Sequence, residues 1–314
     1  MFFPDIPPIR KTVDDRLART PNAGKLVLLH AGIPAALSLV LTALSYVLSS
    51  GIEGTGGLSG LGTRSLLESL QNMLQLCSMV FSLFWSYGYV RLVLSWTRGA
   101  EAEQRQLWAG FRRWGPVLRS LLLQVLVYFA VVFLACQLSS IVFAMSPFSE
   151  SMMQLVEQMM TDASFVPTQE QLLQAMGAYL PFLLVGMAAL VIPVFYRLRL
   201  TQYALMDAPE LGAIHAMRVS LSLTKGNCLR LLRLDLSYWW FYLLEIAVTV
   251  VYYSDLVLQL AGVETGLSAQ VLLALSCVLG LALQLGLYVW RKNQVSTAYA
   301  LVYDCLLPED ARHN

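Results

Sequence analysis

Residues 117–144 read VLRSLLLQVLVYFAVVFLACQLSSIVFA and contain one charged side chain, Arg119, close to the start of the stretch. A helix needs about 20 residues to cross the hydrocarbon core of a bilayer at 1.5 Å per residue. In lipid, a helix also satisfies every backbone donor and acceptor within the segment, which an open strand does not. This stretch therefore predicts a transmembrane helix.

The same pattern recurs along the chain. Five further apolar stretches are near or above the spanning length: 26–49, 70–95, 178–199, 231–254 and 268–290. Together with 117–144 they predict an all-α polytopic membrane protein with six transmembrane helices. We expect the transmembrane domain to cover residues 26–307, between a cytoplasmic amino-terminal segment, 1–25, and a short cytoplasmic tail, 308–314.

Composition agrees with this fold class. The chain of 314 residues is 57% hydrophobic and only 13% charged, with a mean hydropathy of +0.61, whereas a soluble domain carries about 25% charged residues. These values exclude a water-soluble globule and a disordered chain. A formal net charge of +1 argues against a nucleic-acid partner.

The distribution of positive charge predicts the orientation. Cytoplasmic segments next to transmembrane helices are enriched in Lys and Arg. Here twenty of the 21 Lys and Arg side chains fall in the amino-terminal segment, the second and fourth connections and the carboxy-terminal segment, and Arg64 is the exception. We therefore expect both termini to face the cytoplasm, with the protein in the plasma membrane.

Three connections on the cytoplasmic side have helical spacing of apolar residues, which predicts amphipathic interfacial helices at 101–114, 208–225 and 295–307. For the second of these we expect Asp207 as the N-cap and a stop at Gly226, where a left-handed cap is favourable. Each helix follows a span that runs from outside to inside, so the chain is consistent with three copies of a two-span unit.

On the outer side, the sequence between the third and fourth spans is rich in methionine around residues 152–160. Methionine repacks easily against varied surfaces, so this stretch is either a docking site or a lid on the outer leaflet. Thr168 and Gln171 have the spacing of a capping box that would start the fourth span early.

Glu245 is the residue that most directly suggests function. Twelve residues separate it from Arg233, which corresponds to roughly 18 Å of straight helix and places the carboxyl near mid-membrane. An ionisable group there marks a functional site by default. With no cation at the same depth, we expect a protonated carboxyl that hydrogen-bonds to another helix, either for proton-coupled transport or as a structural contact.

Two further features concern the fourth and fifth spans. Asp235 lies close in sequence to a basic cluster, which predicts a boundary ion pair that holds the two helices in register: Arg197, Arg199, Arg230 and Arg233. Pro181 and Pro193 remove backbone donors within the fourth span and are candidates for a kink. A cavity, if present, is expected between these two helices.

Catalytic chemistry has little support in the sequence. The three histidines, His30, His215 and His313, are scattered and none has a second metal ligand at helical spacing. We therefore expect no catalytic residue, no metal and no cofactor.

Several stretches resemble a bacterial integral membrane family of unknown function, domain-of-unknown-function family 975. The stretches are 201–209 (TQYALMDAP), 216–220 (AMRVS), 224–226 (TKG), 231–238 (LLRLDLSY), 296–304 (STAYALVYD) and 98–111. The resemblance implies a six-helix membrane protein and assigns no activity and no functional residue.

The favoured function is a non-catalytic membrane component, for which we expect the lipid bilayer as the main partner and a protein partner at the cytoplasmic interfacial helices. The alternative is a small permease or transporter, either proton-coupled or the membrane subunit of an ATP-driven exporter, with a cavity near Glu245. An intramembrane enzyme is a third and weaker possibility, because no acid, base, nucleophile or metal ligands converge.

Overall fold

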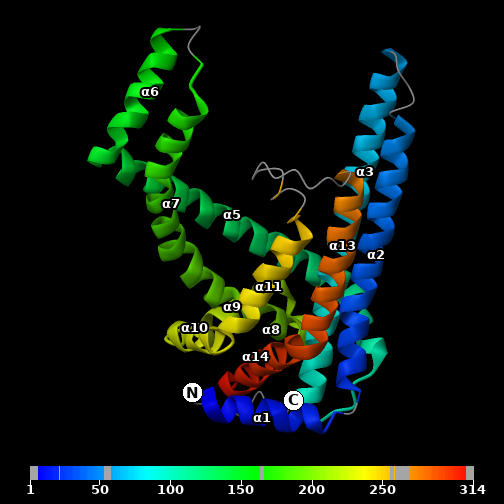
Figure 1. Cartoon of the computed structure of the whole chain (residues 1–314). Coiled ribbons are helices and arrows are strands. Elements are labelled where there is room, and N and C mark those ends of the chain that lie inside the picture. Colours follow the sequence, from blue (N-terminus) through cyan, green and yellow to red (C-terminus); the bar gives the residue numbers. More distant parts are fainter. Residues whose placement is uncertain are drawn as a thin grey trace.

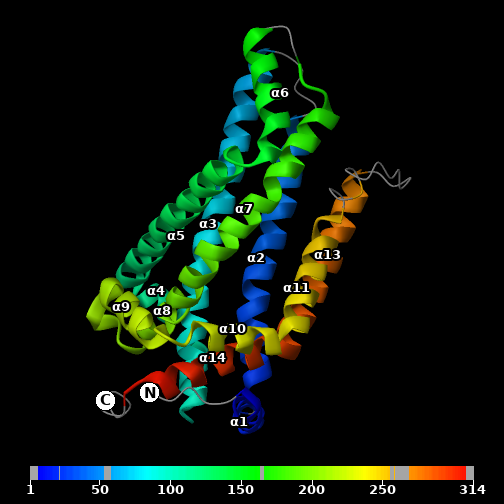
Figure 2. The same cartoon turned by 90° about the vertical axis from the view of Figure 1, so that its left-hand side faces the viewer.

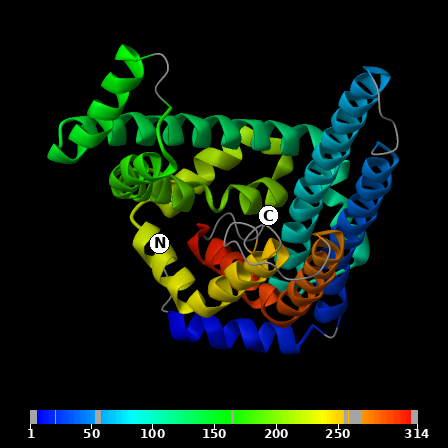
Figure 3. The ribbon, with the colours of Figure 1, turned by 45° about the horizontal axis from the view of Figure 1, so that its top comes forward.

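The computed structural model describes residues 6–20, 22–52, 58–162, 166–254, 258 and 269–308. Within these ranges every regular element is helical. Six long or apolar helices form three consecutive pairs, and each pair packs together. The pairs are α2 (Ala23–Ile52) with α3 (Leu58–Thr97), α5 (Trp114–Ala144) with α7 (Gln169–Leu198), and α11 (Trp239–Tyr252) with α13 (Ala269–Leu287). Figures 1 and 3 show that they occupy different sides of the molecule.

Five of the described helical segments are long and apolar enough to cross a membrane: Ala23–Leu41, Asn72–Thr97, Trp114–Ala144, Met176–Asp207 and Ala274–Leu306. A sixth span is present if the bent pair Cys228–Ser237 and Trp239–Tyr252 counts as one. Apolar side chains on these helices are widely exposed, for example Phe129 at 68% and Val185 at 69%. Such exposure is expected where lipid rather than water is the solvent. The chain is therefore a helical, multi-pass membrane protein.

Shorter helices collect at one end of the molecule, and we call them the lateral layer: α1 (Ile6–Ala18), α8 (Thr201–Asp207), α9 (Gly212–Thr224), α10 (Cys228–Ser237) and α14 (Asn293–Leu306). Figure 2 shows this layer at the foot of the long helices. Both ends of the described chain belong to it, because α1 packs against α14. The described part of the predicted amino-terminal segment is thus largely helical, whereas the predicted tail 308–314 lies outside the described residues except for Pro308.

The buried core lies where the chain leaves the second helix of each pair. Trp96 at the end of α3, Leu205 and Met206 in α8, and Tyr299 in α14 are each 2% exposed or less. The helix predicted at 295–307 is present as α14, and its interfacial position stays a prediction. Side chains on most of its faces are buried, so α14 is a core element of the lateral layer.

The connection after α3 also differs from its prediction. Instead of one amphipathic helix at 101–114, the chain forms a 3₁₀ turn, Gln104–Trp108, and a single helical turn, Ala109–Arg112. This connection packs directly onto α3, where a Cβ on Gly88 would meet the carbonyl oxygen of Leu107 at 1.8 Å. The close approach requires glycine and holds the segment against protein.

The predicted helix at 208–225 is present as α9 but begins later. Asp207 is the last residue of α8 and not an N-cap, and a 3₁₀ turn, Pro209–Leu211, precedes Gly212 with a φ of 78°. The end is as predicted, because α9 stops at Thr224 and Gly226 has a φ of 79°.

The fifth predicted span is not one straight helix. α10 and α11 meet at Tyr238 with a bend of 67°, and α10 runs within the lateral layer. Glu245 therefore lies six residues after Trp239, the first residue of α11, which corresponds to about 9 Å along the axis. The distance counted from Arg233 along a straight helix does not apply.

The fourth span begins as predicted. Thr168 caps α7, and its side chain and that of Gln171 form the reciprocal bonds of a capping box. Pro181 and Pro193 both lie inside α7, which continues through them to Leu198. The methionine-rich stretch before it forms α6 (Glu150–Thr161), in which Met160 is 83% exposed.

Candidate functional site

Arg98 binds carboxylates at or near the ends of two helices of the lateral layer. Its Nη1 donates to Oδ1 of Asp207 at 2.5 Å, and its Nη2 donates to Oδ1 of Asp304 at 2.7 Å. The Tyr303 hydroxyl donates to the second oxygen of Asp207 at 3.1 Å. Because the guanidinium is a planar fork with five donors, it can bind two carboxylates at once.

Arg98, Asp207 and Asp304, which we call the Arg98 cluster, link all three helix pairs. Arg98 follows α3, Asp207 ends α8, and Asp304 lies near the end of α14. The hydrogen bond that Arg98 donates to Asp207, with a further contribution from Asp304, raises the pKa of Arg98 above its usual value. The cluster was not predicted from the sequence. The available signal was one charged residue at or near the end of α3, α8 and α14.

Asp235 lies in a cage of tyrosines. The hydroxyls of Tyr196, Tyr242 and Tyr299 donate to its carboxylate at 2.8, 2.7 and 2.7 Å. These tyrosines belong to α7, α11 and α14, so the carboxylate joins the fourth and fifth predicted spans to the core helix.

The arginines predicted to pair with Asp235 lie in different environments. Arg199 acts on Asp235 electrostatically, and its guanidinium carbon lies 4.7 Å from the centroid of the Tyr299 ring. The residues Arg197, Arg230 and Arg233 have exposed side chains. The described contacts of Asp235 are thus three hydroxyl donors, with Arg199 stacked on the ring of one of these tyrosines, and the boundary ion pair stays a prediction.

Glu245 has a similar environment on the neighbouring helices. Its Oε1 accepts a hydrogen bond from the Tyr288 hydroxyl at 3.2 Å, and Lys292 Nζ lies 3.8 Å from the centroid of that tyrosine ring. Lys292 also interacts electrostatically with Glu245. A hydrogen bond from another helix was expected, whereas the expectation that no cation lies near this carboxyl is wrong.

Tyr288 and Lys292 are the ends of a π-helical turn between α13 and α14. Such turns are rare and often occur at functional sites. Both carboxylates of the fifth predicted span, Asp235 and Glu245, are thus arranged in the same way. Each accepts a tyrosine hydroxyl, and a cation covers the ring of that tyrosine.

Two adjoining cavities lie next to these groups. The polar chamber has a volume of about 300 Å³ and is lined mainly by polar and aromatic side chains, among them Ser86, Tyr89, Gln124, Tyr128, Arg199, Gln202, Tyr203, Lys292, Ser296 and Tyr299. The second chamber has a volume of about 310 Å³ and is lined by the apolar residues Ala31, Pro34, Ala35, Leu281 and Leu285 and by polar ones that include Ser38, Ser82, Gln284, Tyr252 and Tyr288. We call it the apolar chamber because apolar atoms form most of its exposed wall. Three residues, His30, Ser86 and Lys292, line both chambers.

The polar chamber is not where the sequence analysis placed a cavity. It is lined by α2, α3, α5, α7, α8 and α14, and no described residue of the fifth predicted span is among its lining residues. Pro181 instead lines a shallow apolar pocket between α5 and α7. Among the described residues, no three potential ligands are placed to hold a metal ion.

His30 has an unsatisfied ring nitrogen at the junction of the chambers. The residue is 6% exposed, and its ring stacks on Tyr89 with centroids 4.0 Å apart. Its Nδ1 is buried and has no hydrogen-bond partner within the described structure. A buried polar atom without a partner is costly, so this nitrogen is available to a ligand in the chambers.

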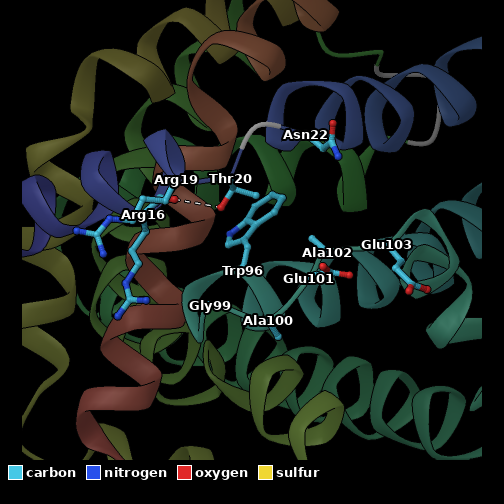
Figure 4. A pocket seen from close by; sticks show the side chains of 10 residues that line it. All are labelled: Arg16, Arg19, Thr20, Asn22, Trp96, Gly99, Ala100, Glu101, Ala102 and Glu103. Atoms are coloured by element: carbon cyan, nitrogen blue, oxygen red, sulfur yellow. Dashed lines mark hydrogen bonds between the residues drawn. The ribbon is translucent and has the colours of Figure 1, made fainter.

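A third cavity of about 670 Å³ opens in the lateral layer, where α1 and α2 meet the connection after α3. Figure 4 shows Arg16 and Arg19 on one side, Glu101 and Glu103 on the other, and Trp96 between them. Opposite charges face each other across this pocket, so it favours neither a cation nor an anion.

Comparison with known proteins identifies the family. A family model of proteins of unknown function, DUF975, matches residues 19–289. The chain belongs to the DUF975 family. No curated protein and no solved structure matches it. The DUF975 match includes Arg98, Asp207, Asp235 and Glu245, and it ends before Asp304.

Proposed function

We propose that this DUF975 protein is a non-catalytic component of the bacterial plasma membrane that acts through lipid contacts of its lateral layer. In this proposal both termini face the cytoplasm, and the lateral layer lies in the inner headgroup region. A protein partner would bind the same layer from the cytoplasm.

The observation that carries the proposal is the orientation of α9. Its buried residues, among them Ala213, Ala216 and Ser220, pack against α5 and α7. The larger apolar residues, whose helical spacing predicted this helix, instead face outward, with Ile214 at 62% exposure and Leu221 at 37%. Apolar side chains of this kind suit the boundary between headgroups and acyl chains.

The next helix continues this surface. On α10, Leu229 is 71% exposed and Leu236 is 58% exposed, and the exposed arginines Arg230 and Arg233 lie between them in sequence. Basic side chains beside an apolar stripe attract anionic lipids. The lateral layer therefore has the chemistry of an interfacial surface.

Spin labels placed around α9 test this proposal. The labels are attached to a chain whose native cysteines are replaced and which is reconstituted in nanodiscs. Labels at Ile214 and Leu221 are expected to be accessible to oxygen dissolved in the lipid. Labels at the exposed positions His215 and Ser222 are the matched controls and are expected to contact a water-soluble relaxation agent. Equal exposure to water at all four positions would refute the interfacial position of α9.

The alternative, a small permease, is favoured by one observation. The Tyr288 side chain lines the apolar chamber and also donates to Glu245, so the cavities approach within one hydrogen bond of this carboxyl. Proton-coupled transport would require Glu245 to change its protonation state. In proteoliposomes that contain a pH-sensitive dye, Glu245→Gln would then abolish proton movement without changing thermal stability, whereas no proton movement by the unaltered chain would oppose this alternative.

A further inference from the structure

The polar chamber contains two cations that have no anionic partner in direct contact. Within the described residues, Arg199 and Lys292 form no ion pair and no hydrogen bond. Arg199 instead lies 4.9 Å from the centroid of the Phe195 ring and 4.7 Å from that of Tyr299, and Lys292 lies over Tyr288. Contacts with ring faces leave the N–H donors of both cations free for a ligand.

The neutralising carboxylates lie outside the chambers. No aspartate or glutamate is among the described residues that line either cavity. Asp235 and Glu245 are separated from the cations by tyrosine side chains, whose hydroxyls already donate to them. Asp235 and Glu245 balance the charge of Arg199 and Lys292 over the whole region. The side chains that face the polar chamber are nevertheless positive and rich in hydrogen-bond donors.

Further donors surround the two cations. Tyr128 and Gln202 line the polar chamber, and the unpartnered Nδ1 of His30 lies at its border with the apolar chamber. Positive charge combined with neutral donors in one concave site is the arrangement that binds phosphate or carboxylate groups.

The apolar chamber determines which kind of anion fits. It adjoins the polar chamber at His30, Ser86 and Lys292, and its walls include Ala31, Ala35 and Leu285. A volume of about 310 Å³ has room for about ten water-sized groups at ~30 Å³ each. A free phosphate would leave this apolar space unfilled, whereas one hydrocarbon chain segment would occupy it.

We propose that the two chambers together bind one anionic amphipath, a lipid with a phosphate or carboxylate headgroup. The headgroup contacts Arg199 and Lys292 in the polar chamber, and a chain segment extends past His30 into the apolar chamber. This site lies within the helix assembly and does not depend on the position of the lateral layer in the headgroup region.

The test uses the full chain in phosphatidylcholine nanodiscs and three probes of matched design. Dodecyl phosphate carries both features of the ligand, inorganic phosphate carries the charge alone, and dodecanol carries the chain alone. Binding is measured as ligand-dependent thermal stabilisation, since a ligand that binds only the folded state raises the melting temperature with its concentration. We expect saturable stabilisation by dodecyl phosphate at concentrations where neither of the other probes has an effect.

Variants assign the effect to the chambers. Arg199→Gln is expected to weaken dodecyl phosphate binding about tenfold or more, the loss expected for a charge-assisted hydrogen bond. Arg197→Gln is the matched control, because this arginine is two residues away, exposed and absent from the cavity walls. Ala35→Phe, which fills the apolar chamber, should reduce the advantage of dodecyl phosphate over inorganic phosphate.

A double variant, Lys292→Met with Glu245→Gln, guards against loss of folding. It removes the second cation without leaving Glu245 unpaired, and it is also expected to weaken binding about tenfold. Equal stabilisation by dodecanol would overturn the anionic part of the proposal, and equal stabilisation by inorganic phosphate would overturn the amphipathic part. Unchanged binding in both Arg199→Gln and the double variant would refute the site itself, whatever the spin labels on α9 show.

Discussion

Replacing Arg98 by alanine is expected to destabilise the protein more than any other arginine change in the lateral layer. The guanidinium bridges Asp207 and Asp304, and the three side chains are 38%, 19% and 22% exposed. At this exposure each ion pair contributes about 0.5–1 kcal/mol. The two carboxylates that Arg98 held together would then repel each other by about 1 kcal/mol, which gives a total loss of about 2–3 kcal/mol.

Chemical denaturation of the full chain in detergent, followed by tryptophan fluorescence, measures this loss. Arg105→Ala is the matched control, because Arg105 is exposed in the same connection and such surface changes usually stay within about 0.5 kcal/mol. Arg98→Lys should recover part of the loss, since lysine keeps the charge but lacks the planar fork. A loss for Arg98→Ala no larger than that for Arg105→Ala would refute the linking role of the cluster.

The pH dependence gives a second check. Arg98 has a raised pKa, chiefly through the hydrogen bond it donates to Asp207, so its contribution is present below the unfolded pKa and is lost only as pH rises through the folded pKa. Both values lie well above neutral pH, since arginine is effectively always protonated. The difference between Arg98→Ala and the unaltered chain should therefore stay constant between about pH 6 and pH 9.

Three further outcomes follow from the structure. Asp235→Asn should lower the free energy of unfolding by about 2 kcal/mol, because three tyrosine hydroxyls lose a charged acceptor, whereas Tyr242→Phe should lower it by about 1 kcal/mol. Equal losses in chemical denaturation would contradict the cage. Gly88→Ala should cost about 1–3 kcal/mol by forcing the next connection off α3, whereas Gly115→Ala, with nothing within 4 Å of the added carbon, should not lower the melting temperature. In a chain without its native cysteines, Met160→Cys in intact cells should react with a membrane-impermeant thiol reagent. The absence of labelling would contradict the predicted topology.

Much of the fold could be predicted from the sequence because lipid imposes simple requirements. A stretch such as 117–144 needs only sufficient length and few charges to be recognised as a spanning helix, and the structure has α5 there. The capping box at Thr168 and the stop at Gly226 were also predictable, since each depends on a few neighbouring residues. Local patterns were therefore reliable where local chemistry decides the outcome.

The sequence pattern was ambiguous where a neighbouring element decides which face of a helix is buried. Apolar spacing in 295–307 is equally compatible with an interfacial helix and with a core helix, and packing against α1 and α3 makes α14 a core helix. On α9 the same ambiguity has the opposite result, because small residues such as Ala213 and Ala216 pack inward and the larger apolar residues face outward. Periodicity alone does not identify the partner surface.

The amino-acid sequence by itself determined that this chain is solvated by lipid and helical, and it singled out Asp235 and Glu245 as unusual, because a charge among apolar residues is visible without any structure. The tertiary structure alone decided what those carboxylates contact. The bend at Tyr238 and the π-helical turn at Tyr288–Lys292 bring to these carboxylates tyrosines and cations from distant parts of the chain. Hydrogen bonds and ion pairs act over a few ångströms in space, so their partners depend on how the three helix pairs pack.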